Sequence, residues 1–144
     1  MSALRRFSRL APPDRRLVVQ ACGWLVVFRI ALWVLPWRRV IALVGASPTA
    51  ASSRSSVDRL EWAVRVTSRC VPRATCLTQS LALARLLARN GYTGRVQIGV
   101  RHGTRFDAHA WVEHEGTTLL TSTGSAAQYS RLISWDVAPP VRSR

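Results

Sequence analysis

A cysteine that begins a helix is the residue of this chain best suited to covalent chemistry. Thr75 is a typical helix N-cap residue, and it places Cys76 in the first turn of the helix that follows. The helix dipole, the free amides of that turn and the guanidinium of Arg73 all favour a thiolate over a thiol. The backbone N–H of Cys76 can also face a developing oxyanion. Cys76 is therefore the predicted nucleophile.

A thiolate nucleophile needs a base that passes its proton to the leaving group. The chain has three histidines, and His102 falls in a predicted turn. His109 and His114 lie on opposite faces of one predicted strand, which His109 begins. A histidine on a rigid strand can be held at hydrogen-bond distance. His109 is the leading candidate for the base, and a packed or surface histidine is the equal alternative on spacing alone.

Other side chains near these two have a functional and a structural interpretation each. Thr75 and Gln79, which lies one helical turn beyond Cys76, are candidates for an oxyanion or substrate cleft. A polar contact on the helix flank is the favoured alternative for Gln79. Trp111 either walls a cleft or packs as a core aromatic. Arg85 and Arg89 are expected on the solvated face of their helix.

The charge of the chain is strongly positive and comes from arginine alone. Its 21 basic residues are all arginine, against 7 acidic residues, for a net charge of +14. Such a surface attracts nucleic acid, anionic membranes or acidic peptides. A non-enzymatic arginine-rich module that binds nucleic acid or a membrane surface is the alternative function. The arginines are spread over the whole chain without a nucleic-acid-binding signature, so we expect no nucleic-acid partner.

The three cysteines, Cys22, Cys70 and Cys76, form no spacing pattern of a disulfide scaffold or a zinc site. We interpret Cys22 as a small core residue and Cys70 as part of a connector. The sequence predicts a reducing, cytoplasmic location, and no metal or other cofactor.

An apolar run near the N-terminus, Leu17 to Trp37, follows a basic segment and has the profile of a signal-anchor. Gln20 and Arg29 interrupt it, and Pro36 ends it. We therefore expect two core-facing helices, with contact between residues 17–44 and a membrane surface as the alternative. The organisation that we predict is a basic arm, an apolar helical pair and a linker over 1–56, and a core over 57–144.

The core begins with helices and ends with strands. Apolar spacing predicts one helix from residue 57 until before Pro72 and another from Thr75 or Cys76 to Asn90. Period-two alternation then predicts strands over 95–101, 109–113 and 117–121, with a short strand or loop over 128–135. The expected fold is α+β, with N-terminal helices packed on a small antiparallel meander.

Two segments of the core carry a family resemblance: CLTQSLALARLLARNGYTGRVQIGV, from Cys76, and FDAHAWVEHEG, from Phe106. In order and spacing they resemble the leader peptidases of lasso-peptide biosynthesis, which are transglutaminase-like, papain-related cysteine peptidases. The apolar, arginine-bearing N-terminal helices resemble the stand-alone members of that family. The resemblance implies a transglutaminase-like fold with Cys76 as nucleophile and His109 as general base. It also implies cleavage of a ribosomally made precursor peptide between leader and core.

The sequence departs from the family pattern in one place. Many members carry an aspartate after the strand that follows the histidine, where it orients the imidazole. Ser122 stands at about that position here, and it is the candidate for the third member of the site. A hydroxyl can fix the tautomer but stabilises imidazolium less than a carboxylate. Glu113, within the signature, either serves the site or pairs with an arginine.

The resemblance also implies partners. Residues 1–56 show no strand pattern suited to a leader-recognition domain, so a separate recognition protein and a lasso cyclase are expected beside the precursor peptide. A transferase with an amine as acyl acceptor is a further alternative, because hydrolysis and transfer pass through the same acyl-enzyme.

Overall fold

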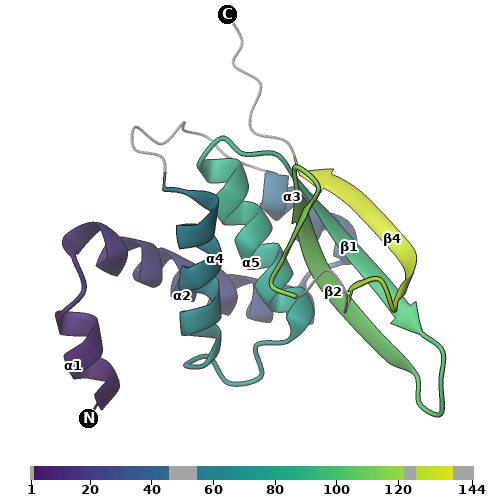
Figure 1. Cartoon of the computed structure of the whole chain (residues 1–144), viewed down its shortest axis with the longest axis horizontal. Coiled ribbons are helices and arrows are strands. Elements are labelled where there is room, and N and C mark those ends of the chain that lie inside the picture. The colour runs from purple at the N-terminus through teal and green to yellow at the C-terminus, as the bar shows by residue number, and fades with distance from the viewer. Residues whose placement is uncertain (1, 46–54, 122–125, 138–144) are drawn as a thin grey trace, which may run out of the picture.

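The computed structural model of the chain describes residues 2–45, 55–121 and 126–137. Five helices precede four strands (Figure 1). The helices are α1 (Ser2–Ser8), α2 (Pro12–Val34), α3 (Trp37–Gly45), α4 (Val57–Ser68) and α5 (Cys76–Arg89), and the strands are β1 (Gly94–Arg101), β2 (Asp107–His114), β3 (Thr117–Leu119) and β4 (Ser130–Val137). The expected α+β class is confirmed, and the basic arm contains the short helix α1.

The apolar run forms α2, which buries one stripe of its surface. Leu17, Ala21, Leu25, Phe28 and Ala31 recur at helical spacing and face α4 and α5. The helix ends before Pro36, where the amide of Leu35 still donates to the carbonyl of Ala31 at 2.8 Å. The two apolar helices thus contribute to the core, as predicted, although α2 buries only one of its faces.

Helix α5 is the central element of the core. All nine residues from 80 to 88 are buried, and the helix contacts α2, α3, α4 and both β1 and β2. Arg85 was expected in solvent, but it is only 5% exposed. Its guanidinium lies 4.6 Å from the ring centroid of Trp24 and donates to the terminal carbonyl of Val44 in α3 at 3.4 Å. A cation–π contact and an unsatisfied helix-end carbonyl offset its desolvation, and burial lowers the pKa of Arg85.

The four strands form one antiparallel sheet in the order β3-β2-β1-β4. The predicted antiparallel meander is confirmed for β1, β2 and β3, and β4 pairs with β1 at the edge opposite β3, a position that the sequence does not specify. β3 is shorter than predicted. Leu120 has a left-handed backbone (φ 67°), and its amide donates to Glu61 of α4 at 2.8 Å instead of continuing the ladder. The last strand reaches Val137, beyond the predicted end at residue 135.

One face of the sheet packs against the helices. Val96 and Val112 share the core with helical side chains, and a Cβ at Gly94 would lie 3.3 Å from Leu87 of α5. Since side chains alternate along a strand, Gln97, Gly99, His109, Trp111 and Glu113 occupy the opposite face.

Candidate active site

Cys76 is the first residue of α5, as the sequence predicts. The side chain of Thr75 accepts the amide of Thr78 at 3.3 Å, and the two threonine hydroxyls lie 3.0 Å apart. Cys76 is half-buried and has a free thiol. The cap fixes the start of the helix, so the thiol sits where the helix presents unpaired backbone amides. The predicted N-cap is thereby confirmed.

The turn that leads into Cys76 is held by Gln79. The side-chain amide of Gln79 donates to the carbonyl of Ala74 at 3.0 Å. Just before it, Arg73 adopts a left-handed backbone (φ 58°), a conformation that costs a non-glycine residue about 1–2 kcal/mol. The Gln79 amide is thus engaged on the helix flank in this structure, and its role toward an oxyanion stays a prediction. A left-handed non-glycine residue close to Cys76 is the kind of local strain that clusters at functional sites.

His109 lies in an aromatic cluster on the outer face of the sheet. Its ring stacks on Trp111 at 6.1 Å between centroids, with the planes 22° apart, and lies 5.4 Å from the ring of Tyr129. Trp111 is 1% exposed and is not part of the helix–sheet core. Trp111 is therefore a buried residue that contacts the imidazole outside the helix–sheet core, and its role as the wall of a cleft stays a prediction.

Glu113 holds this cluster together from its far end. One carboxylate oxygen accepts the indole N–H of Trp111 at 3.2 Å and pairs with Arg131 of β4 at 2.9 Å. The other accepts the side-chain amide of Gln97 at 3.2 Å. Glu113 thus pairs with an arginine, as one alternative predicted, and it also fixes the ring on which His109 stacks.

Tyr129 is a residue of the site that the sequence reasoning missed. Its hydroxyl donates to Asp107 at 2.8 Å, and Arg101 pairs with the same carboxylate oxygen at 2.9 Å. The hydrogen bond to Asp107 is the main cause that raises the pKa of Tyr129, followed by desolvation; the charge of Cys76 also raises it. Tyr129 therefore lies within electrostatic range of Cys76 and in ring contact with His109.

A glycine in the middle of β1, at a register shift in its pairing with β4, is the sequence signal for Tyr129. Gly99 pairs with His109, and a Cβ there would lie 2.8 Å from Cβ of Tyr129 and 2.9 Å from the ring of Trp111. A strand glycine often marks a close approach of another part of the chain. The sequence alone does not say which part approaches.

Helix and strand geometry places Cys76 and His109 at the same end of the domain. α5 and β1 are joined by a short turn and run in opposite directions (Figure 1). From the contact between Leu87 and Gly94, the eleven residues back to Cys76 span roughly 16 Å of helix. The five residues from Gly94 to Gly99, the partner of His109, span roughly 16 Å of strand. Cys76 and His109 therefore lie at about the same distance from the turn that joins α5 to β1.

The direct link between the two is not formed in this structure. Among the described residues, no hydrogen bond joins the sulfur of Cys76 to the imidazole of His109, whose ring instead contacts Trp111 and Tyr129. Catalytic hydrogen bonds are often long without substrate and shorten in the complex.

Ser122, the predicted third member, lies outside the described residues. Glu61 fixes the chain just before it, through the amide of Leu120.

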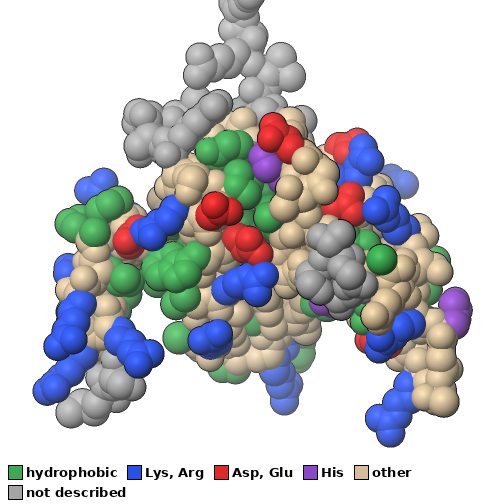
Figure 2. Space-filling view, viewed as in Figure 1, with side chains coloured by type: hydrophobic (Ala, Val, Ile, Leu, Met, Phe, Trp, Pro, Cys, Tyr) green, Lys and Arg blue, Asp and Glu red, His purple; other side chains and the backbone are tan. Residues whose placement is uncertain are grey.

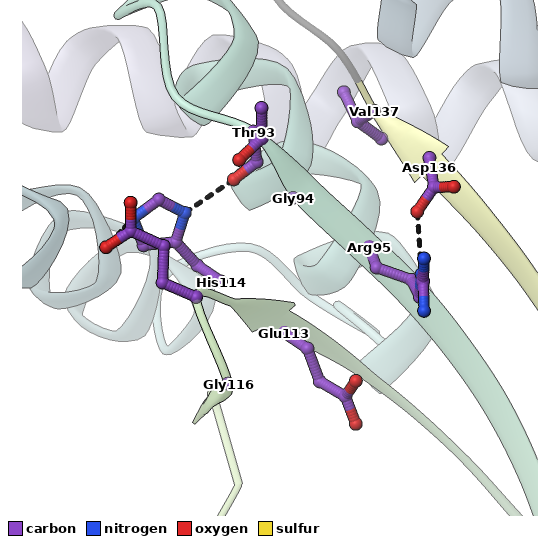
Figure 3. A pocket seen from close by; sticks show the side chains of 9 residues that line it. Thr93, Gly94, Arg95, Glu113, His114, Gly116, Asp136 and Val137 are labelled. Carbon is purple, nitrogen blue, oxygen red and sulfur yellow. Dashed lines mark hydrogen bonds and ion pairs between the residues drawn. The ribbon is translucent and has the colours of Figure 1, made fainter.

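The remaining histidines are not part of this arrangement. His102 is exposed in the β1–β2 turn. A hollow of about 380 Å³ is lined by residues 93–95, 113–116, 136 and 137. His114 lies at this hollow, at the end of β2 opposite His109 (Figure 3). Its Nδ1 lies 2.5 Å from the carbonyl oxygen of Thr93, and its ring packs on Tyr92. These contacts give His114 a structural role.

The part of the chain that the structure describes contains no group of three or more His, Cys, Asp or Glu side chains that could hold a metal ion.

In comparisons with known proteins, a family model described as Transglutaminase-like superfamily matches residues 22–134. No curated protein and no solved structure matches significantly. The matched range contains α5, the whole of β2 and Tyr129.

Proposed function

Because the chain belongs to the transglutaminase-like superfamily, whose members are typically cysteine hydrolases or transferases, we propose that it is a cysteine peptidase. Its substrate is a ribosomally made precursor peptide, from which it removes the leader during lasso-peptide maturation. The observation that carries this proposal is the capped helix start at Cys76, level with a strand histidine that two aromatic rings hold.

The reaction proceeds through a thioester. The sulfur of Cys76 attacks the carbonyl carbon of the scissile bond while its proton goes to His109, and His109 then gives that proton to the leaving amine. The first-turn amides of α5 stabilise the oxyanion of the tetrahedral intermediate. Water, deprotonated by His109, attacks the thioester, the C–S bond breaks, and the leader leaves with a free carboxyl end while His109 returns the proton to the sulfur of Cys76. An amine in place of that water would give transfer.

The side chains around the imidazole orient it for these steps. Trp111 supports one side of the ring and Tyr129 contacts it from another, and Glu113 and Asp107 fix the two aromatic residues by hydrogen bonds. A histidine that is held in this way loses little freedom on reaching the transition state. Ser122 is proposed as a weaker stand-in for the aspartate that orients the histidine in relatives.

Leader recognition is proposed to come from a separate protein. All strands of the described residues lie after Asn90, and the part before it is helical, so a strand-based peptide-binding domain is not found there. The net charge of +14 favours association with an acidic leader or recognition protein, and the cyclase would act on the released core. The proposed location is the cytoplasm, where precursor peptides are made.

The test is cleavage of the precursor peptide with its recognition protein, followed by mass spectrometry. Cys76→Ala and His109→Ala should lower the rate by at least about 1000-fold. Cys70→Ala and His102→Ala change an exposed thiol and an exposed imidazole and serve as matched controls. Ser122→Ala tests the third member.

The product mass decides between outcomes. Free leader and core support hydrolysis, whereas a new amide between leader and added amine supports transfer. Cleavage by Cys76→Ala at the wild-type rate would refute the assignment of the nucleophile. Loss of cleavage in Cys70→Ala as severe as in Cys76→Ala would show that the variants report folding instead of chemistry.

A further inference from the structure

The outer face of α2 is an apolar stripe that no other element among residues 2–45, 55–121 and 126–137 covers. Six of the nine large apolar side chains that are exposed in the described residues lie on this helix, at 41–74% exposure. We call them the α2 stripe: Val19, Val26, Val27, Ile30, Trp33 and Val34. They recur at three-, four- and seven-residue spacing and so occupy one side of the helix. A patch of this kind on a small domain marks an interaction surface.

The surroundings of the α2 stripe are cationic at both ends. Arg15 and Arg16 precede it, and Arg38 and Arg39 follow it at the start of α3; all four are exposed. The guanidinium of Arg29 lies 5.6 Å from the ring centroid of Trp33. Figure 2 shows basic side chains gathered over α1 and the start of α2, at the left of the molecule.

Negative charge near the stripe is already neutralised. Asp14, in the first turn of α2, forms an ion pair with Arg59 of α4. A second copy of the chain docked on the stripe, parallel or antiparallel, would bring arginines against arginines. An apolar stripe between arginines instead fits a surface that is apolar within and anionic at its boundary.

We propose that the α2 stripe docks the protein on the surface of a membrane that contains anionic lipid. The apolar side chains enter the acyl boundary, and the arginines contact the lipid phosphates. Trp33, beside Arg29, occupies the headgroup level, where tryptophan is preferred.

The packing of α2 decides how it meets the membrane. This helix is long and apolar enough to cross a bilayer, but core helices of soluble proteins and signal sequences share these two properties. Its other side, from Leu17 to Ala31, is buried against α4 and α5. Crossing would strip this side from the core, so the helix lies along the membrane surface with the domain attached.

Co-sedimentation of the full chain with vesicles tests this proposal. The wild type should sediment with vesicles of phosphatidylcholine and phosphatidylglycerol, and less as the salt concentration rises, because salt screens the arginines. Replacing Ile30, Trp33 and Val34 by glutamine should weaken binding at least about ten-fold. Replacing Arg38 and Arg39 by glutamine should weaken it about five-fold for each charge.

The matched control is Leu132→Gln with Ile133→Gln, which removes two exposed apolar side chains from β4. This variant should bind like the wild type. The triple stripe variant should keep the wild-type circular dichroism and cleave the precursor in solution, since it leaves the site intact.

Three results would overturn the proposal. The first is a wild type that fails to bind anionic vesicles, and the second is a triple variant that binds them as well as the wild type does. The third is a wild-type dimer in gel filtration that the triple variant converts to a monomer, which would show that a second copy covers the stripe. None of these results bears on the peptidase activity, which is measured without vesicles.

Discussion

Replacing Gly99 by alanine is expected to disturb the candidate site directly. The added Cβ would lie 2.8 Å from Cβ of Tyr129, 2.9 Å from Cη2 of Trp111 and 3.1 Å from the carbonyl oxygen of Ser130. The Cβ of Tyr129 and the backbone of Ser130 cannot swing away as the end of a long side chain would. Relief therefore requires β4 to move away from β1, and Tyr129 moves with it.

Overpacking of this kind costs about 1–3 kcal/mol in a well-packed interior. For a chain of this length, each kcal/mol corresponds to a fall in Tm of about 3 °C, so the expected fall is about 3–9 °C. The loss of activity should be larger than the loss of stability suggests. A displacement of about 1 Å of the ring that contacts His109 can reduce the rate by about 100-fold.

Thermal unfolding and precursor cleavage measure the two effects of Gly99→Ala, each compared with two other glycine variants. Gly103→Ala, in the β1–β2 turn, meets no atom within 4 Å and should change little. Gly23→Ala, equally open and in a helix, should raise the unfolding free energy by about 0.5–1 kcal/mol.

A further comparison isolates one contact. In a Trp111→Phe background the Cη2 atom is absent, so Gly99→Ala should cost less than in the wild type. If Gly99→Ala melts and cleaves like Gly103→Ala, then Tyr129 does not pack on this strand, and its place beside His109 is wrong.

Three further predictions concern the groups that hold the site. Thr75→Ala should lower the unfolding free energy by about 1 kcal/mol in urea titrations, and Thr75→Ser should not, because only a side-chain oxygen caps the helix. Glu61→Gln should cost about 1 kcal/mol and slow cleavage, since a charged acceptor for the amide after β3 is lost, whereas Glu115→Gln, with an exposed side chain, should do neither. The hydrogen bond to Asp107 raises the pKa of Tyr129 above its ordinary value of 10.0. The stability that this bond contributes is therefore complete below the ordinary value and is lost as the pH rises through the pKa of Tyr129 in the folded protein. Urea titrations at increasing alkaline pH should thus show a smaller fall in unfolding free energy for Tyr129→Phe than for the wild type.

Local signals were sufficient for the nucleophile helix. A threonine cap before Cys76 and the Asn90-Gly91 pair mark the two ends of α5, and both ends are where the sequence predicts them. Period-two alternation likewise predicted β1 and β2 to within two residues at each end. These features depend on neighbouring residues, so they can be read without knowing the fold.

The missed features depend on contacts between distant residues. The pairing of β4 with β1, which the sequence does not specify, brings Tyr129 onto Gly99 and His109. β3 ends early because Glu61, in a helix far back in the chain, accepts the amide of Leu120. In neither contact does the local sequence around one residue predict which distant residue it meets. The burial of Arg85 has the same origin, since its partners lie in α2 and α3.

The proposed membrane surface and the candidate site are compatible because of the order in which the elements pack. α2 packs against α4 and α5, and α5 packs against β1 and β2, so α5 lies between α2 and the sheet. The α2 stripe is on the side of α2 that points away from α5, whereas Cys76 begins α5 and His109 lies in β2, on the far side of α5 from α2. Docking on a membrane through the stripe therefore leaves the imidazole and its aromatic supports toward water. A precursor peptide and its recognition protein can reach them from solution, whereas docking through the sheet would block them.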